Sequence, residues 1–367
     1  MPENKTDSSA GRLESLDVLR VVATVAVVAI HVSAATLLNT PREALGYAVA
    51  GFLNQASRFA VPAFVLITGA GLFLTYGQRR DVSWLHYFRR RFQAIGVPYL
   101  LWSVAYFFFY RVVERDFTAL IPGLLKALAT ASAVYTFYYF IIIVPFYLLF
   151  PLLRPLAHSR WLGPVTVLAL ALNGLIVWFG FPHVKFHLGP VLSRLWPYGG
   201  FTPLWWAGPF FLGAWLALRW ESAGAWLRRC WAALMGLAAI LLVWVLVEFQ
   251  AYVSAGRLAY VATNFRPSAY TYGLAVMPAI IGLGEVLTGR SAGVRRAIRW
   301  LSRLSFGVYL VHPLVMSVAR NILGLLDLGA LEYLALNLLL VLALSYLASF
   351  ILARLPLGGW LIGLGRR

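Results

Sequence analysis

The strongest constraint on the fold of this chain is a series of apolar runs, each about 20 residues long. A run of that length crosses the hydrocarbon core of a bilayer as an α-helix, in which every backbone group is hydrogen-bonded internally. Hydrophobic residues make up 61% of the chain and charged residues 12%, whereas soluble domains are roughly a quarter charged. The sequence therefore predicts an all-α, polytopic transmembrane helix bundle in a lipid bilayer. About ten spans are expected, near residues 17–38, 54–76, 92–112, 137–154, 162–180, 202–219, 230–249, 269–288, 303–324 and 331–353.

The connections between these runs alternate in charge. Arginine is concentrated in one set of connections, residues 77–91, 154–160, 219–229 and 289–303. Because positively charged loops remain in the cytoplasm, this side is predicted to be cytoplasmic, and an even number of spans places both termini there. Much of the formal net charge of +18 is then topological, and no nucleic-acid partner is expected.

The chain is expected to consist of one membrane domain with two short ends. We predict a disordered cytoplasmic N-terminus over residues 1–15, a transmembrane domain over 16–355 and a cytoplasmic C-terminal tail over 356–367. The single cysteine, Cys230, excludes an intramolecular disulfide and a multi-cysteine metal site. No metal is expected.

Three of the connections on the other side of the membrane are long for a helix bundle, and two of them have a notable composition. Residues 116–131 are amphipathic, so they are expected to lie along the membrane interface or to re-enter the bilayer. Residues 181–200 combine histidine, lysine and arginine with tryptophan and tyrosine. This loop is suited to holding a sugar or a pyrophosphate, although an interfacial loop with aromatic anchors has the same composition.

The first apolar run carries Arg20 at one end and His31 inside it. Eleven residues of α-helix turn the chain through three full turns and about 20°, so both side chains share one face, roughly 16 Å apart along the axis. Asp17 lies one turn before Arg20 and is placed to orient it. Together they are expected to line one wall of an internal path. The simpler alternatives are a snorkelling arginine at the cytoplasmic end and a structural histidine.

Several segments together resemble one family, the acyltransferase-3 family of integral membrane acyltransferases. The first run has its pattern of an arginine, ten residues and a histidine. The later segments resemble family motifs in the same order, and the resemblance covers nearly all of the chain. These segments are "LDVLRVVATVAVVAIH", "VPAFVLITGAGLF", "FRRRFQAIGVPYLLWS", "YYFIIIVPFYLLFPLL", "FFLGAWLA" and "LSFGVYLVHPLV".

The resemblance implies an acyl-CoA-dependent O-acyltransferase. Such enzymes move an acyl group, commonly acetyl, from cytoplasmic acyl-CoA to a sugar hydroxyl of a surface polysaccharide or a lipid-linked glycan precursor. The donor is then acetyl-CoA or another acyl-CoA, and Arg20, Arg89, Arg90 and Arg91 are expected to bind its phosphates. The alternative for Arg89, Arg90 and Arg91 is that they only contribute to the positive charge of a cytoplasmic connection. We expect a multi-pass protein of a bacterial-type inner (cytoplasmic) membrane.

The same resemblance suggests roles for individual residues. His31 is expected to act as general base on the acceptor hydroxyl, or to carry the acyl group transiently. Ser305, Tyr309 and His312 share one helix face and are candidates to stabilise the oxyanion of the tetrahedral intermediate, with Tyr309 and His312 as catalytic residues and Ser305 and Asp17 as orienting residues. Pro313 would free a backbone carbonyl, and a structural kink is the alternative.

Some positions depart from the family pattern. Thr68-Gly69-Ala70 stands where many members have Ser-Gly-Tyr, and Tyr138 and Tyr139 stand where tryptophan is common. These departures affect the expected acceptor specificity more than the expected acyl-transfer chemistry. Four other polar residues lie at or within spans, and the two glutamates are expected to be solvated at helix ends: Arg58, Asn173, Glu248 and Glu285.

A second class of function fits part of the same pattern. A polar path lined by Arg20 and His31 is also what a transporter or flippase for a polysaccharide precursor needs. The absence of a recognisable internal repeat weighs against that reading.

Overall fold

The computed structural model describes residues 4–180, 200 and 202–365, and these residues form helices and connections without a strand. Within them, nine helices are long and apolar enough to cross a membrane, and Pro203–Leu218 adds a shorter apolar helix at the sixth predicted run, 202–219. The all-α polytopic bundle is therefore confirmed. The long elements are α1 Asn4–Asn39, α2 Leu45–Ala56, α3 Ala60–Leu72, α4 Trp84–Arg91, α5 Val97–Glu114, α6 Leu120–Thr130, α7 Tyr138–Leu153, α8 Leu162–Gly180, α10 Ala207–Leu218, α11 Trp220–Ser254, α13 Pro267–Arg290, α14 Ala292–Leu323 and α15 Ala330–Arg354.

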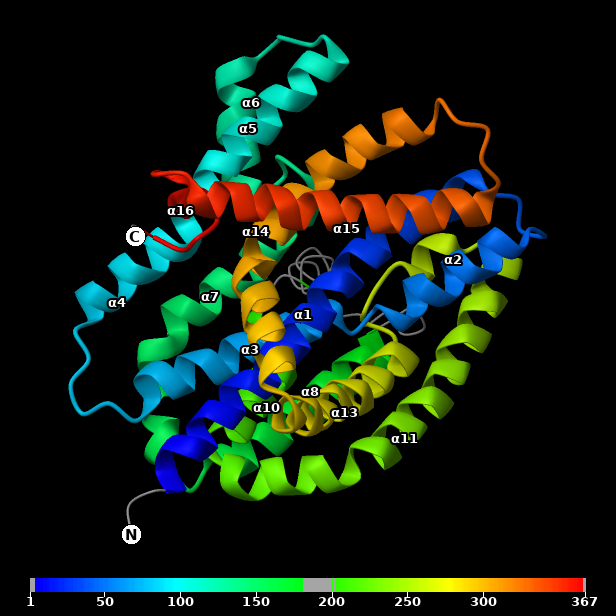
Figure 1. Cartoon of the computed structure of the whole chain (residues 1–367). Coiled ribbons are helices and arrows are strands. Elements are labelled where there is room, and N and C mark those ends of the chain that lie inside the picture. The colour runs from blue at the N-terminus through cyan, green and yellow to red at the C-terminus, as the bar shows by residue number, and fades with distance from the viewer. Residues whose placement is uncertain (1–3, 181–199, 201, 366–367) are drawn as a thin grey trace, which may run out of the picture.

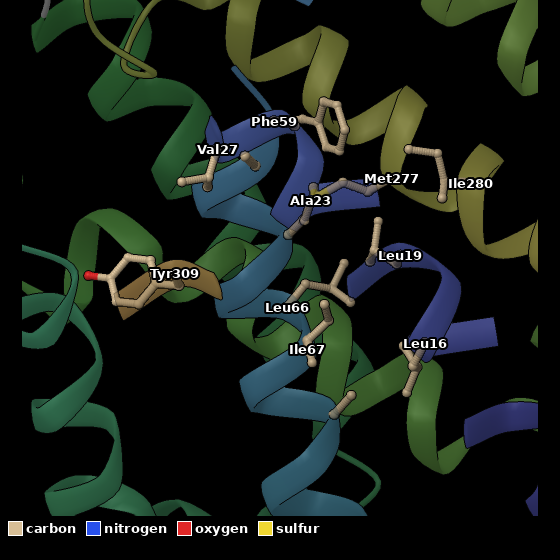
Figure 2. Close-up of a cluster of buried hydrophobic side chains, with 14 of the residues drawn as sticks. Leu16, Leu19, Ala23, Val27, Phe59, Leu66, Ile67, Met277, Ile280 and Tyr309 are labelled. Atoms are coloured by element: carbon tan, nitrogen blue, oxygen red, sulfur yellow. The ribbon is translucent and has the colours of Figure 1, made fainter. Parts of the chain in front are cut away.

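Helix α1 is the central element of the bundle. It packs against α2, α3, α13, α14 and α15, while the long α11 runs along the outside and packs on α13 (Figure 1). Leu16, Leu19, Ala23 and Val27 of α1 lie in the main buried cluster with side chains of α3 and α13 (Figure 2). Apolar residues at a spacing of three or four place one stripe of α1 in this core, which fixes how its polar residues are presented.

The second predicted span is broken in two. The apolar helix begins at Leu45 rather than near residue 54, and residues 57–59 interrupt it between α2 and α3. The Tyr272 hydroxyl donates to the carbonyl of Ala56 at 2.8 Å and satisfies a group that the break leaves free. Discontinuous helices of this kind often surround binding sites in membrane proteins, and Arg58 lies in the break.

Most of the amphipathic segment at 116–131 forms α6, which returns beside α5 as a helical hairpin (Figure 1). The Tyr99 hydroxyl of α5 donates to the carbonyl of Leu128 at 2.5 Å. In the turn between the helices, donors of Thr118 and the Arg111 guanidinium hold the pKa of the Asp116 carboxyl below its usual range. Residues 131–137 then link α6 to α7, so the fourth predicted span continues this segment.

Two glycines allow α3 and α10 to cross closely. A Cβ atom at Gly69 would lie 2.0 Å from the carbonyl oxygen of Phe210, and one at Gly213 would lie 1.9 Å from that of Leu66. Both contacts are with backbone, so the helices would have to separate to admit even a methyl group. Small residues at such crossings let helix backbones approach in a membrane.

Replacing Gly213 with alanine is expected to destabilise the protein by about 1–3 kcal/mol, the usual effect of overpacking. The apparent melting temperature of the detergent-solubilised protein, followed by size-exclusion chromatography after heating, measures this effect. Gly236→Ala is the matched control, because no atom lies within 4 Å of a Cβ built at Gly236. Equal melting temperatures for the two variants would refute the close crossing.

The arginine-rich connections gather at one end of the bundle, which we call the arginine end. Arg154 donates from its Nε to the carbonyl of Tyr76 at 3.2 Å and also bonds the carbonyl of Arg79. The C-terminal segment lies at this end, where the Trp102 indole donates to the carbonyl of Leu361 at 2.9 Å. The predicted loop at 181–200 lies outside the described residues except for Gly200, and α1 is described from Asn4, within the segment predicted to be disordered.

Candidate functional site

Two cavities lie inside the bundle and share part of their lining. The first, called the arginine cavity, has a volume of about 290 Å³ and is lined by Arg20 and Arg91 at the arginine end. The second, called the histidine cavity, has a volume of about 740 Å³ and is lined by His31 and Arg58. Phe64, Tyr139 and Tyr309 line both. Arg20 and His31 thus line two neighbouring cavities with a shared wall, and the continuous internal path expected from the sequence stays a prediction.

Arg20 is held by two partners at the mouth of the arginine cavity. Its Nη1 donates to Asp17 Oδ1 at 2.7 Å and to the Ser302 hydroxyl at 2.8 Å, and that hydroxyl donates to the same Asp17 oxygen at 2.6 Å. Arg20 keeps 36% of its side chain exposed. Asp17 contacts Arg20 as its position one turn away suggested, and its orienting role stays a prediction, whereas Ser302 was not predicted.

The arginine triplet at the end of α4 is divided between two surfaces. The Arg91 guanidinium lies 5.6 Å from the ring centre of Tyr76, 5.7 Å from that of Tyr147 and 6.0 Å from that of Tyr87. These cation–π contacts fix Arg91 in the wall of the arginine cavity. Arg89 and Arg90 are exposed and line a separate hollow of about 370 Å³ with His86 and Gln93.

His31 is packed between two aromatic rings in the wall of the histidine cavity. Its ring centre lies 4.8 Å from that of Tyr135 in an edge-on arrangement and 5.5 Å from that of His312 in a stacked one. Tyr135 comes from the link between α6 and α7, and His312 comes from α14. Three distant parts of the chain therefore fix the orientation of this imidazole.

His312 is fully buried and bonded to its own helix. Its Nδ1 lies 2.8 Å from the carbonyl of Tyr309, the group that Pro313 leaves without its helical N–H, and 3.2 Å from that of Val308. Two carbonyl neighbours assign the ring proton to Nδ1. Nε2 is then the basic nitrogen, and no described residue bonds to it. The carbonyl that Pro313 was predicted to free is that of Tyr309, and it fixes the tautomer of His312.

The kink in α14 also admits a side chain from another helix. The Tyr106 hydroxyl donates to the carbonyl of Leu310 at 2.7 Å and accepts from the N–H of Leu314 at 3.2 Å. It thereby bridges two backbone groups that would bond each other in a regular helix. This insertion ties the His312 segment to α5.

The other predicted residues of α14 also donate to backbone carbonyls. The Tyr309 hydroxyl donates to Thr136 at 2.6 Å, and the Ser305 hydroxyl donates to Leu301 at 3.1 Å. Ser305 lines the arginine cavity, and Tyr309 lines both cavities. In this conformation both hydroxyl protons are engaged by the backbone, and Tyr309 forms part of the wall that the two cavities share.

Buried polar residues form a cluster beside the histidine cavity. Arg58 donates to the carbonyl of Ala262 at 2.7 Å and to Asn54, and Arg266 donates to Glu248 at 3.2 Å and to Gln55. Glu248 is less solvated than expected, since its side chain is 20% exposed and its carboxylate is paired with Arg266 and also accepts from Ser268. Arg266 was not predicted, because an arginine before a proline at a helix start looks like part of a loop.

The departures from the family pattern lie on cavity walls. Thr68 lines the arginine cavity, Tyr138 lines the histidine cavity and Tyr139 lines both. Trp205, Trp206 and Phe265 add further aromatic surface to the histidine cavity, with the Phe265 ring 4.7 and 5.0 Å from the two indoles. Among residues 4–180, 200 and 202–365, no group of three or more histidine, cysteine, aspartate or glutamate side chains is arranged to hold a metal ion.

The fold defines a multi-pass membrane protein with two neighbouring internal cavities. The family model of the acyltransferase-3 family, described as an acyltransferase domain, matches residues 13–354. The chain belongs to this family and is a membrane acyltransferase. Searches among curated proteins and among solved structures gave no match.

Proposed function

We propose that this protein transfers an acyl group, in particular acetyl, from cytoplasmic acyl-CoA to a sugar hydroxyl of a surface polysaccharide or a lipid-linked glycan precursor. We place it in a bacterial-type inner membrane, with the arginine end in the cytoplasm. The observation that carries the proposal is the pair of neighbouring cavities that share Phe64, Tyr139 and Tyr309 in their walls. One presents guanidinium groups and the other presents His31.

The arginine cavity suits the donor. CoA carries a pyrophosphate and a 3′-phosphate, and planar guanidinium groups bind phosphates well. A volume of about 290 Å³ lies at the lower limit of ligand pockets, which are roughly 300–1,000 Å³. The cavity therefore suits the slender pantetheine arm, with the nucleotide at its mouth beside Arg20 and Arg91. The acyl end then reaches the junction with the histidine cavity.

The histidine cavity suits the acceptor. Its volume of about 740 Å³ and its tryptophan and tyrosine lining fit a sugar with part of its linkage. In the proposed reaction His31 takes the proton of the acceptor hydroxyl while the oxygen attacks the thioester carbonyl. The C–S bond then breaks, and the CoA sulfur leaves with the proton that His31 had taken. The products are the acylated sugar and free CoA.

The proposal is tested by the transfer of radiolabelled acetyl from acetyl-CoA to a glycan fraction from cell envelopes, with purified full-length protein in lipid nanodiscs. We expect base-labile label on the glycan and stoichiometric release of CoA thiol. A transporter or flippase would move a precursor without consuming acetyl-CoA. Failure to bind acetyl-CoA, or no thiol release with any acceptor, would refute the proposal.

The division of the arginine triplet gives a prediction within the same assay. Arg91→Ala is expected to weaken acetyl-CoA binding by about 10- to 100-fold, the effect of losing a charged hydrogen-bond donor. Arg90→Ala is the matched control, because the exposed Arg90 lines the separate hollow, and we expect its dissociation constant to change much less. Titration of labelled acetyl-CoA measures both constants. An effect of Arg90→Ala equal to or larger than that of Arg91→Ala would contradict the assignment.

A further inference from the structure

The buried cluster beside the histidine cavity carries more positive than negative charge. It contains the guanidinium groups of Arg58 and Arg266 and a single carboxylate, that of Glu248. Glu248 is paired with Arg266, and the hydrogen bonds of Arg58 run to neutral groups, the carbonyl of Ala262 and the side chain of Asn54. Burying a charge is costly unless an opposite charge compensates it. Arg58 therefore lacks a counter-ion among the described residues.

Arg58 is presented to the cavity and is not closed off within the cluster. It lines the histidine cavity with His31, yet only 8% of it is exposed. Its Nε is buried and has no hydrogen-bond partner among the described residues. None of the described residues that line the cavity is acidic, and residues 181–199 contain no aspartate or glutamate. A ligand can therefore supply the missing negative charge.

Arg58 is held firmly enough to recognise such a ligand. It lies in the break between α2 and α3, where the helical backbone is interrupted. Asn54, which accepts from Arg58, donates to the carbonyl of Ile30 at 3.0 Å and to the Ser33 hydroxyl at 3.1 Å. These bonds connect Arg58 to the same turn of α1 that carries His31. The cation and the imidazole thus have fixed positions on one cavity wall.

We propose that the acceptor carries a permanent negative charge close to the hydroxyl that is acylated, and that Arg58 is the residue that binds this charge. The inference rests on the proposed function and narrows its acceptor to an anionic glycan. The charge is supplied either by a carboxylate on the sugar or by the phosphate that links the sugar to a lipid. Both groups accept hydrogen bonds from a guanidinium in the same geometry.

The test compares charged and neutral probes of otherwise similar structure. Methyl glucuronide is paired with methyl glucoside for the carboxylate, and farnesyl phosphoglucose is paired with farnesyl glucoside for the phosphate. Binding to the full-length protein in nanodiscs is measured by calorimetry without acyl-CoA, and acetyl transfer is measured separately. The variants are Arg58→Gln, Arg58→Lys and, as the matched control, Arg42→Gln, which changes an exposed arginine.

We expect the wild type to prefer the charged member of at least one pair, and Arg58→Gln to weaken its binding by about 10- to 100-fold. Arg58→Lys should retain most of the preference, and the neutral probes and Arg42→Gln should show little change. The pair that responds identifies the source of the charge. Equal binding of charged and neutral probes by the wild type, or equal losses for both in Arg58→Gln, would overturn the proposal. Charge-dependent binding without acetyl transfer would refute the proposed acyl transfer, but it would leave the binding of an anionic ligand by Arg58 standing.

Discussion

Replacing His31 with alanine is expected to lower the rate of acetyl transfer by about 10²–10⁴-fold, the usual contribution of a general base. The dissociation constant of acetyl-CoA should change little, because His31 lines the histidine cavity and not the arginine cavity. Single-turnover transfer to the glycan acceptor and direct titration of acetyl-CoA measure the two quantities separately. Incubation with labelled acetyl-CoA without acceptor, followed by denaturation, shows whether the imidazole itself carries the acyl group.

His158→Ala is the matched control for this experiment. His158 is an exposed histidine after α7 and lines neither cavity. We expect it to leave transfer and binding unchanged. If His31→Ala retains full transfer, or if it weakens acetyl-CoA binding as much as it slows transfer, the role of His31 as general base is wrong.

Replacing Arg20 with alanine is expected to affect acetyl-CoA binding more than acetyl transfer, the reverse of His31→Ala. Loss of a charged donor at the mouth of the arginine cavity should weaken acetyl-CoA binding by about 10- to 100-fold. Transfer at saturating acetyl-CoA should fall much less than it does in His31→Ala. Arg20→Lys should recover part of the affinity, because lysine keeps the charge but cannot form the planar paired bonds of a guanidinium.

The bonds that hold Arg20 provide a control for this prediction. Asp17 and Ser302 each accept one hydrogen bond from the guanidinium, and a third hydrogen bond joins Ser302 to Asp17. Ser302→Ala removes one orienting group without removing the charge, and we expect a weaker loss of affinity than for Arg20→Ala. Equal effects of Arg20→Ala and His31→Ala on acetyl-CoA binding would contradict the assignment of donor and acceptor cavities.

Much of the fold was predictable because lipid leaves the backbone few choices. Long apolar runs must form helices, and their positions follow from hydropathy. The sequence did not reveal where helices break. The interruption at residues 57–59 is stabilised by Tyr272, more than 200 residues away, and the bend at Pro313 holds Tyr106 from another helix. Such contacts between distant segments leave no local pattern.

The candidate site was predictable where its geometry is local. Arg20, Asp17 and His31 lie on one helix, so helical periodicity placed them on one wall. The stacking of His312 on His31 and the contact with Tyr135 depend on how α1, α14 and the α6–α7 link pack together. Helical spacing grouped Ser305, Tyr309 and His312, but it gave no sign that each would bond a backbone carbonyl. The charge of Arg58 was visible, whereas its lack of a carboxylate partner was not.

A structure of the protein with a non-reactive analogue of acetyl-CoA, in which a methylene group separates the sulfur from the carbonyl, tests the central claim most directly. The account predicts the nucleotide at the mouth of the arginine cavity beside Arg20 and Arg91. The acetyl end should lie at the junction formed by Phe64, Tyr139 and Tyr309, within reach of the His31 imidazole. A nucleotide bound in the histidine cavity, or an acetyl group that lies away from this junction, would contradict the account.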